Sequence, residues 1–285
     1  MEESIKAPDR LAVLQRIAEY ERNGFFDLDV EDDPPGIDLD PEKVDFLDKR
    51  IVNKVKTRIA NYLGKRFFEK ILDKKHVVFR GVSGLENLEG YRGGAIVTCN
   101  HCHRFDNYAV YLGLKKHFKR FRLYKVVREG NYAFPGKLGF ILRNCDTLPV
   151  GGDHRLTAEC MKAVKTLLDK NKKVLVYPEQ GMWWNYKKPR PLKRGAFLFA
   201  AKSDAPIIPC FITLKDCDKV GEDGFPVQEF TLHILPLIRA DKNLSVKENC
   251  DRMRAKNFEL WKNLYEKVYG EPLRYGDGAA NFSFH

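Results

Sequence analysis

The sequence predicts an α/β fold with a mostly parallel central sheet, helices on both faces of the sheet, and amphipathic helices at the N-terminus. Short apolar, β-branched runs recur from residue 76 onward, and helical patterns alternate with many of them. Polar residues follow directly after two of these runs, as they do at the carboxyl ends of parallel strands. With 285 residues, 44% of them hydrophobic, the chain is long enough for one substantial core and an appendage.

Residues 1–40 are predicted to form an acidic N-terminal arm. Residues 8–22 follow the pattern of a short amphipathic helix and meet Asn23-Gly24, a helix stop. The next segment, FDLDVEDDPPGIDLD, is acidic and broken by two prolines and a glycine, which indicates an extended linker. Residues 1–48 carry a net charge of −10, against +21 for the remainder. We therefore expect the acidic segment from Asp27 to Asp48 to cover the basic surface formed by residues 50–70 and 115–125 when no membrane is present.

Residues 41–75 are predicted to form a basic amphipathic helix or a helix pair. Asp40-Pro41 supplies a helix cap and a first-turn proline, and Gly64 is a point where the helix kinks or divides. Such a helix either lies in a membrane interface or packs its apolar stripe against the body. A second basic stretch at 115–125 is interleaved with aromatic residues. No recognisable nucleic-acid-binding module accompanies these charges, so nucleic acid is not an expected partner.

Residues 76–285 are predicted to form the main α/β domain. The clearest crossover helix covers 157–169, and Ser245 with Glu248 forms a capping-box pattern before a last amphipathic helix. No apolar run reaches the ~18–20 residues that cross a bilayer. The predicted strands are residues 76–80, 94–98, 122–127, 145–150, 173–177, 206–214 and 230–237.

The turn within VTCNHCHRFDNYAV, residues 97–110, carries the first candidate catalytic side chains. A helical step of five residues would leave His101 and Asp106 roughly 140° apart, so we expect His101 to precede the helix and Asp106 to reach back to the imidazole. A histidine held by a carboxylate is a general base for a hydroxyl or a thiol. The alternative is a buried histidine beside an aspartate that only caps the helix.

The same turn contains Cys99, Cys102 and His103 in the order C-x-x-C-H, the form of a c-type haem attachment site. Haem attachment requires an exported chain, and residues 1–40 show no basic start followed by an apolar segment. A zinc site would need a second cysteine or histidine pair at finger-like spacing, and none follows. We expect no metal or haem, reduced thiols at all seven cysteines, and a cytoplasmic protein.

A second polar group follows the strand predicted at 173–177. The run KKVLVYPEQGMWW delivers Glu179 to the carboxyl end of that strand. Two parallel strands would then share one mouth, with His101 and Glu179 at neighbouring ends. The residues alone leave three interpretations of Glu179: it binds a substrate hydroxyl, it holds the loop, or it caps a turn.

The order of these motifs resembles the glycerolipid acyltransferase family, typified by 1-acylglycerol-3-phosphate acyltransferase. The family's N-H-x-x-x-x-D motif is similar to Asn100, His101 and Asp106. Its F-P-E-G motif is similar to residues 177–180, and its proline-bearing strand to residues 206–209. The family's second motif is weaker here, around residues 134–150. The resemblance covers roughly residues 76–237.

This resemblance implies an O-acyltransferase that moves a fatty acyl group from acyl-CoA or acyl carrier protein to the hydroxyl of a lysophospholipid, with neither metal nor bound cofactor. It implies that His101 takes the acceptor proton, that Asp106 orients His101, and that Glu179 helps to seat the acceptor. The implied substrate-binding residues are Asn100, Arg104, Glu179, Gln180, Gly181, Arg155, Lys187 and Arg190.

The chain departs from the family at two positions. The family's second and third motifs each usually carry an arginine associated with the acceptor phosphate, and these positions look like Gly152 and Met182 here. We expect Arg155 or the basic cluster at 187–190 to take over that contact. Two alternatives stay open: an acyltransferase for an acceptor without phosphate, and a non-catalytic lipid- or coenzyme A-binding protein on the same fold.

The implied acceptor and product both reside in membranes, which predicts a peripheral protein on the inner face of the membrane. The basic helix within 41–75 and the stretch at 115–125 would attract an anionic membrane surface.

Overall fold

The computed structural model describes residues 6–32, 37–119 and 121–276. Pro34, Pro35 and Gly36 of the predicted linker and Arg120 of the second basic stretch lie outside these ranges.

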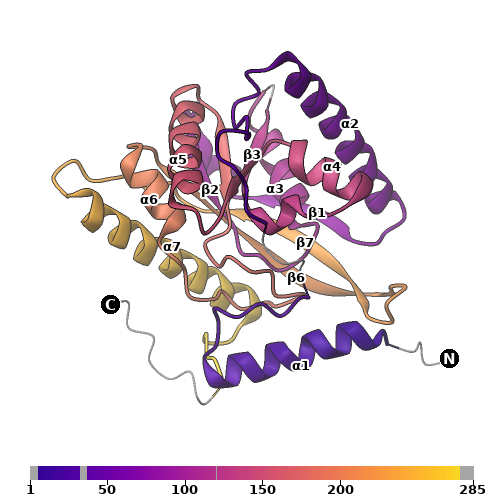
Figure 1. The fold of residues 1–285 in the computed structure, drawn as a ribbon. Helices are drawn as coiled ribbons and strands as arrows, with labels where there is room; N and C mark the ends of the chain where they lie inside the picture. Colours follow the sequence, from indigo (N-terminus) through magenta and orange to yellow (C-terminus); the bar gives the residue numbers. More distant parts are fainter. Residues whose placement is uncertain (1–5, 33–36, 120, 277–285) are drawn as a thin grey trace.

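A seven-stranded sheet in the order β1-β7-β6-β2-β5-β3-β4 forms the centre of the molecule, with helices around it (Figure 1). Every pairing between these strands is parallel except that of β6 with β7. The predicted fold class is therefore confirmed. The strands are β1 (Val78–Ser83), β2 (Ala95–Thr98), β3 (Leu123–Arg128), β4 (Thr147–Val150), β5 (Lys173–Val176), β6 (Ile207–Val220) and β7 (Pro226–Ile234).

All seven predicted strands are present, and the last two differ most from the predicted bounds. β6 continues to Val220, beyond the predicted end at 214, and β7 begins at Pro226 instead of 230. The two strands form an antiparallel pair whose outer part is largely exposed on β6. Four of the six residues from 215 to 220 are charged, so the apolar run that predicted this strand stops at Leu214, where its burial also stops.

Helices cover both faces of the sheet. On one face α5 (His154–Asp169), α6 (Gly195–Lys202) and α7 (Val246–Tyr269) share an apolar cluster with Ile96 and Val174 of the sheet. On the other face α3 (Asp106–Lys115) packs with Val97 and Leu175. Neighbouring residues of β2 and β5 thus point into opposite layers, as the pleat of a strand requires. The capping box predicted for α7 is present: the Ser245 side chain accepts from the backbone N–H of Glu248.

Helix α2 (Ile51–Asp73) is continuous and begins ten residues later than predicted, so the prediction of a helix cap at Asp40-Pro41 is wrong. The carboxylate of Asp45 accounts for the difference, because it accepts hydrogen bonds from the backbone N–H groups of Lys49 and Arg50 and holds the preceding turn. Gly64 neither kinks nor divides the helix. Gly64 faces α4 (Gly136–Asn144), where a Cβ would make ordinary van der Waals contact with Cys145 Sγ at 3.5 Å.

Only a narrow stripe of α2 is buried, at Thr57, Ala60 and Gly64. Phe68, Ile71 and Leu72 near its end are partly buried against the core. Seven other apolar side chains of the helix are exposed, and lysines and arginines lie between them. Ile51 is 78% exposed and Tyr62 is 64% exposed, and packing against the body therefore accounts for one side of the helix only. No helix among the described residues is both long and apolar enough to cross a bilayer. The exposed apolar residues of α2 are Ile51, Val52, Val55, Ile59, Tyr62, Leu63 and Phe67.

Helix α1 (Pro8–Asn23) confirms the first predicted helix and ends at Gly24, which has a left-handed conformation. α1 and α2 lie at opposite ends of the molecule (Figure 1). α1 contributes Val13 and Ile17 to an apolar cluster with Phe26, Val30 and buried Trp183. The described part of the N-terminal arm is therefore packed onto the body, next to the loop that follows β5.

Candidate active site

The candidate active site lies where β2 and β5 end. The two strands are parallel neighbours in register, with Thr98 opposite Val176. Their carboxyl ends therefore meet at one edge of the sheet, and the loops that follow them carry His101 and Glu179. The predicted shared mouth is present.

His101 precedes α3, which begins at Asp106, as the spacing predicted. Its Nδ1 lies 2.7 Å from Asp106 Oδ2. The same buried oxygen accepts hydrogen bonds of 3.2 Å from the backbone N–H groups of Cys102 and His103. Asp106 thus contacts the histidine and also holds the turn before α3.

The other ring nitrogen of His101 is placed to act as a base. An ionised carboxylate only accepts hydrogen bonds, so Asp106 selects the tautomer in which Nδ1 carries the proton and Nε2 has a free lone pair. The His101 side chain is 22% exposed and lines a cavity. A hydroxyl group in that cavity can reach the unprotonated nitrogen.

Tyr177 completes the group around Asp106, a role that was not predicted from the sequence. Its hydroxyl donates to Asp106 Oδ1 at 2.5 Å. Its ring stacks on the His101 imidazole, with centroids 3.9 Å apart and planes 12° apart. Burial raises the pKa of the Tyr177 phenol well above its usual value, so the hydroxyl stays protonated and donates. The F-P-E-G motif has phenylalanine at this position. The extra hydroxyl of Tyr177 was therefore the only feature of the sequence that could have indicated this contact with Asp106.

Glu179 holds the two loops together. Its buried carboxylate accepts from the backbone N–H of His101 at 3.0 Å and from the backbone N–H of Arg190 at 2.7 Å. The Arg190 guanidinium lies 3.2 Å from the same carboxylate, and both side chains are almost completely buried. Of the three interpretations of Glu179, this geometry corresponds to the one in which it holds the loop. Arg190 also lies over the ring of Trp183, within the protein and away from the cavity surface.

Asn100, Gln180 and Gly181 shape the backbone around His101. Asn100 is buried and exchanges two hydrogen bonds, of 2.7 and 3.0 Å, with the backbone of Ile212 in β6. Gln180 has a φ of 67° and replaces the motif's glycine, so the chain keeps the left-handed conformation that glycine favours. A Cβ at Gly181 would lie 2.4 Å from Asp29 Oδ1, which places the N-terminal arm directly against this loop.

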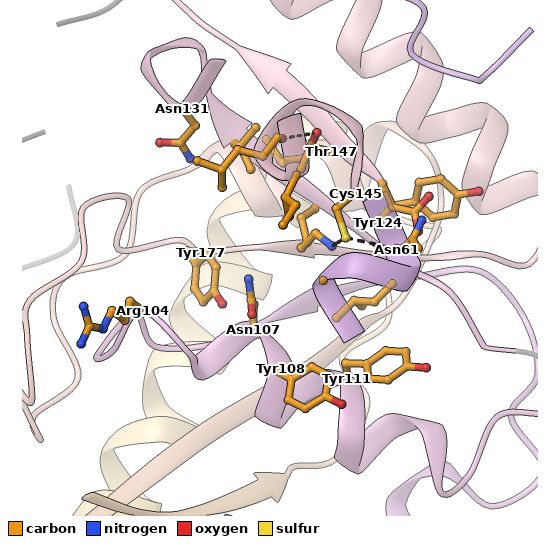
Figure 2. Close-up of a pocket in the computed structure, with 18 of the residues that line it drawn as sticks. Asn61, Arg104, Asn107, Tyr108, Tyr111, Tyr124, Asn131, Cys145, Thr147 and Tyr177 are labelled. Carbon is orange, nitrogen blue, oxygen red and sulfur yellow. Dashed lines mark hydrogen bonds between the residues drawn. The ribbon is translucent and has the colours of Figure 1, made fainter. Parts of the chain in front are cut away.

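The structure does not bring Arg155 or Lys187 to His101. The Arg155 side chain is 81% exposed and pairs with Asp153 at the start of α5. Lys187 lies 3.9 Å from Asp216 on β6. Neither residue is among those that line the cavity, whereas Arg104 and Met182 are. The Arg104 guanidinium lies over the Phe105 ring and extends away from Tyr177 (Figure 2).

The C-x-x-C-H residues are packed inside the protein. Cys99 and Cys102 belong to an apolar cluster, and burial raises the pKa of both thiols well above the usual value. Burial lowers the pKa of His103 to about 4, and its Nδ1 accepts from the backbone N–H of Phe105. In the part of the chain that the structure describes, no group of three or more histidine, cysteine or acidic side chains has the arrangement of a metal site.

The cavity beside His101 has a volume of about 1640 Å³, more than the roughly 300–1,000 Å³ of typical small-molecule sites. Figure 2 shows residues that line it, among them Asn61 of α2, Tyr108 and Tyr111 of α3, and Tyr124 of β3. Phe67 and Phe68 of α2 also line it, so aromatic side chains from three elements surround a space that extends from His101 to α2. Basic residues also line it, and only Arg104 among them was predicted from the sequence as a site residue. They are Lys54, Arg58, Lys65, Arg104, Arg122, Lys125, Arg128, Lys137 and Lys193.

Comparisons with known proteins agree with this geometry. Residues 80–213, which include His101, Asp106 and Glu179, match the family model described as Acyltransferase. The chain is 28% identical over 144 residues to 1-acyl-sn-glycerol-3-phosphate acyltransferase BAT2, chloroplastic, from Brassica napus. That match covers 50% of this chain and 39% of the relative, so the chain spans well under half the length of this relative.

A solved structure shows the same fold. It is that of the 1-acyl-sn-glycerophosphate (LPA) acyltransferase PlsC from Thermotoga maritima, with a TM-score of 0.52 and 18% sequence identity. The match covers 93% of this chain and 97% of that chain. This structure supports the fold, and the family match with the relative from Brassica napus confirms the resemblance to glycerolipid acyltransferases.

Proposed function

We propose, from the acyltransferase-family region at residues 80–213, that this protein transfers a fatty acyl group from a thioester donor, acyl-CoA or acyl carrier protein, to the hydroxyl of a lysophospholipid. The observation that carries the proposal is the His101–Asp106 pair, which opens onto a large cavity lined by aromatic and basic side chains. This combination suits an acceptor that has a hydroxyl group, an acyl chain and an anionic head group.

The proposed reaction needs one base and one leaving group. His101 Nε2 takes the proton of the acceptor hydroxyl while the oxygen attacks the thioester carbonyl carbon. Asp106 stabilises the imidazolium that forms, and Tyr177 keeps the carboxylate in place. The carbon–sulfur bond then breaks, the thiolate leaves, and the imidazolium returns a proton to the sulfur. The products are an ester and a free thiol, and the proposed reaction uses no metal or bound cofactor.

Replacing His101 with alanine is expected to lower the rate of acyl transfer about 10²- to 10⁴-fold, the usual contribution of a general base. Asp106→Asn is also expected to lower the rate strongly, because the amide no longer selects the Nδ1–H tautomer. The measurement is steady-state acyl transfer from acyl-CoA and from acyl carrier protein to a panel of lysolipids. His154→Ala, a change at an exposed histidine at the start of α5, is the matched control. Near-normal turnover in folded His101→Ala protein would disprove the mechanism.

We also propose that the protein docks on an anionic membrane surface, peripherally and from the cytoplasmic side. The exposed apolar face of α2 and its basic residues support this, since Tyr62, Phe67, Arg58 and Lys65 also line the cavity. Lipid that entered beneath α2 would follow the cavity toward His101. In the stretch at 115–125, Phe118 and Tyr124 are buried, so only its charged residues would contribute to docking.

Vesicle sedimentation tests the docking proposal. Each basic residue near an anionic surface contributes about 1 kcal/mol, so binding to phosphatidylglycerol vesicles is expected to exceed binding to phosphatidylcholine vesicles and to weaken with salt. The triple variant I51S/V55S/I59S is expected to bind about tenfold more weakly, because three exposed side chains no longer enter the lipid. The control V246S/V268S changes exposed valines of α7 and is expected to bind like the wild type. Equal binding to both vesicle types at low salt would rule out electrostatic docking.

A further inference from the structure

Two basic residues that line the cavity are paired with acidic residues of the N-terminal arm. Arg128, the last residue of β3, makes a two-pronged contact with Asp29, with distances of 2.6 and 3.1 Å. Lys193, shortly before α6, lies 2.6 Å from Asp27. Both cations are on the cavity wall that also contains His101. The acidic arm therefore neutralises charge at the candidate active site. Farther along the acidic segment 27–48, Asp48 accepts from Thr57 of α2 and lies 3.6 Å from Arg122 of the second basic stretch.

Apolar contacts fix the position of these carboxylates. Phe26 and Val30 are buried on either side of the acidic pair. The Phe26 ring stacks on Trp183 with centroids 5.6 Å apart, and the Trp183 indole donates to the backbone carbonyl of Leu28. The position of the arm on the body thus does not depend on its two ion pairs.

The exposure of the ion pairs shows which of them can exchange with a ligand. The Arg128 and Asp29 side chains are 47% and 41% exposed, and those of Lys193 and Asp27 are 41% and 64% exposed. Such half-exposed pairs contribute little stability, and another anion can replace the carboxylate. The planar guanidinium of Arg128 binds a phosphate with the same two-pronged geometry that it uses for Asp29. Arg190 differs because its pairing with Glu179 is buried.

We propose that Arg128 and Lys193 form the subsite for the phosphate monoester of the acceptor, and that Asp29 and Asp27 occupy this subsite in the free protein as internal anions. The identity of the ligand, the phosphate of a lysophospholipid acceptor, rests on the acyl transfer proposed above. It explains how the chain binds a phosphate without arginines at positions 152 and 182. The acceptor must displace the two carboxylates, so the arm weakens acceptor binding.

Binding of glycerol 3-phosphate, measured by isothermal titration calorimetry, tests the subsite without any turnover. The double variant D27N/D29N removes the internal anions and is expected to bind about 3- to 10-fold more tightly than the wild type. R128Q/K193Q is expected to bind more weakly than the wild type. The control D32N removes an acidic residue of the same arm, whose carboxylate pairs with Arg16 outside the cavity, and is expected to leave binding unchanged. Equal binding by D27N/D29N and the wild type, or undiminished binding by R128Q/K193Q, would overturn the proposal.

Kinetics separate the acceptor phosphate from the phosphates of the donor. In D27N/D29N the KM for lysophosphatidic acid is expected to fall by the same factor as the Kd, while the KM for a monoacylglycerol and the KM for acyl-CoA stay constant. A fall in the acyl-CoA KM alone would mean that the subsite binds the donor and would overturn the proposal. If the wild type transfers no acyl group to any lysolipid, the proposed function fails, and the order of the glycerol 3-phosphate affinities still decides whether the subsite exists.

Discussion

The buried carboxylate of Glu179 is the group on which the geometry of the site most depends. It accepts hydrogen bonds from the backbone of His101 and of Arg190, and it forms an ion pair with the Arg190 guanidinium. Removing one partner of such a buried pair typically costs about 3–5 kcal/mol, because the other charge is left without compensation. The loops after β2 and β5 are therefore held in one relative position, and Asp106 and Tyr177 then fix the imidazole within it.

The same ion pair links the active site to the N-terminal arm. Arg190 reaches the backbone carbonyl of Phe26, and Trp183 of the loop after β5 stacks on the Phe26 ring of the arm. Helix α2 lies at the opposite end of the molecule from α1 (Figure 1), and Tyr62 and Phe67 of its exposed apolar face line the same cavity. Cations paired with the acidic arm and residues of the basic, apolar helix thus line one cavity. This arrangement gives a physical reason for the charge difference between the first 48 residues and the rest of the chain.

The features that could be predicted from the sequence are those with a local pattern. Seven apolar runs indicated seven strands, and a five-residue spacing after one of them placed His101 before the helix and Asp106 within reach. The features that could not be predicted depend on contacts between distant segments. Asn100 is held by the backbone of β6, and Arg190 is buried beneath the N-terminal arm, so neither has the role that its motif or its charge implied. The hydroxyl of Tyr177 carried little signal, because an aromatic residue after an apolar strand also fits ordinary packing.

The tautomer of His101 tests the central claim most directly, since base catalysis here requires a lone pair on Nε2. Nitrogen NMR of protein labelled in its histidine rings distinguishes a protonated Nδ1 from a protonated Nε2. The geometry predicts that neutral His101 carries its proton on Nδ1, donated to Asp106, and that the Asp106→Asn variant loses this preference. A proton on Nε2 in the wild type, or an identical tautomer in both proteins, would contradict the assignment of Asp106 and His101 as orienting residue and base.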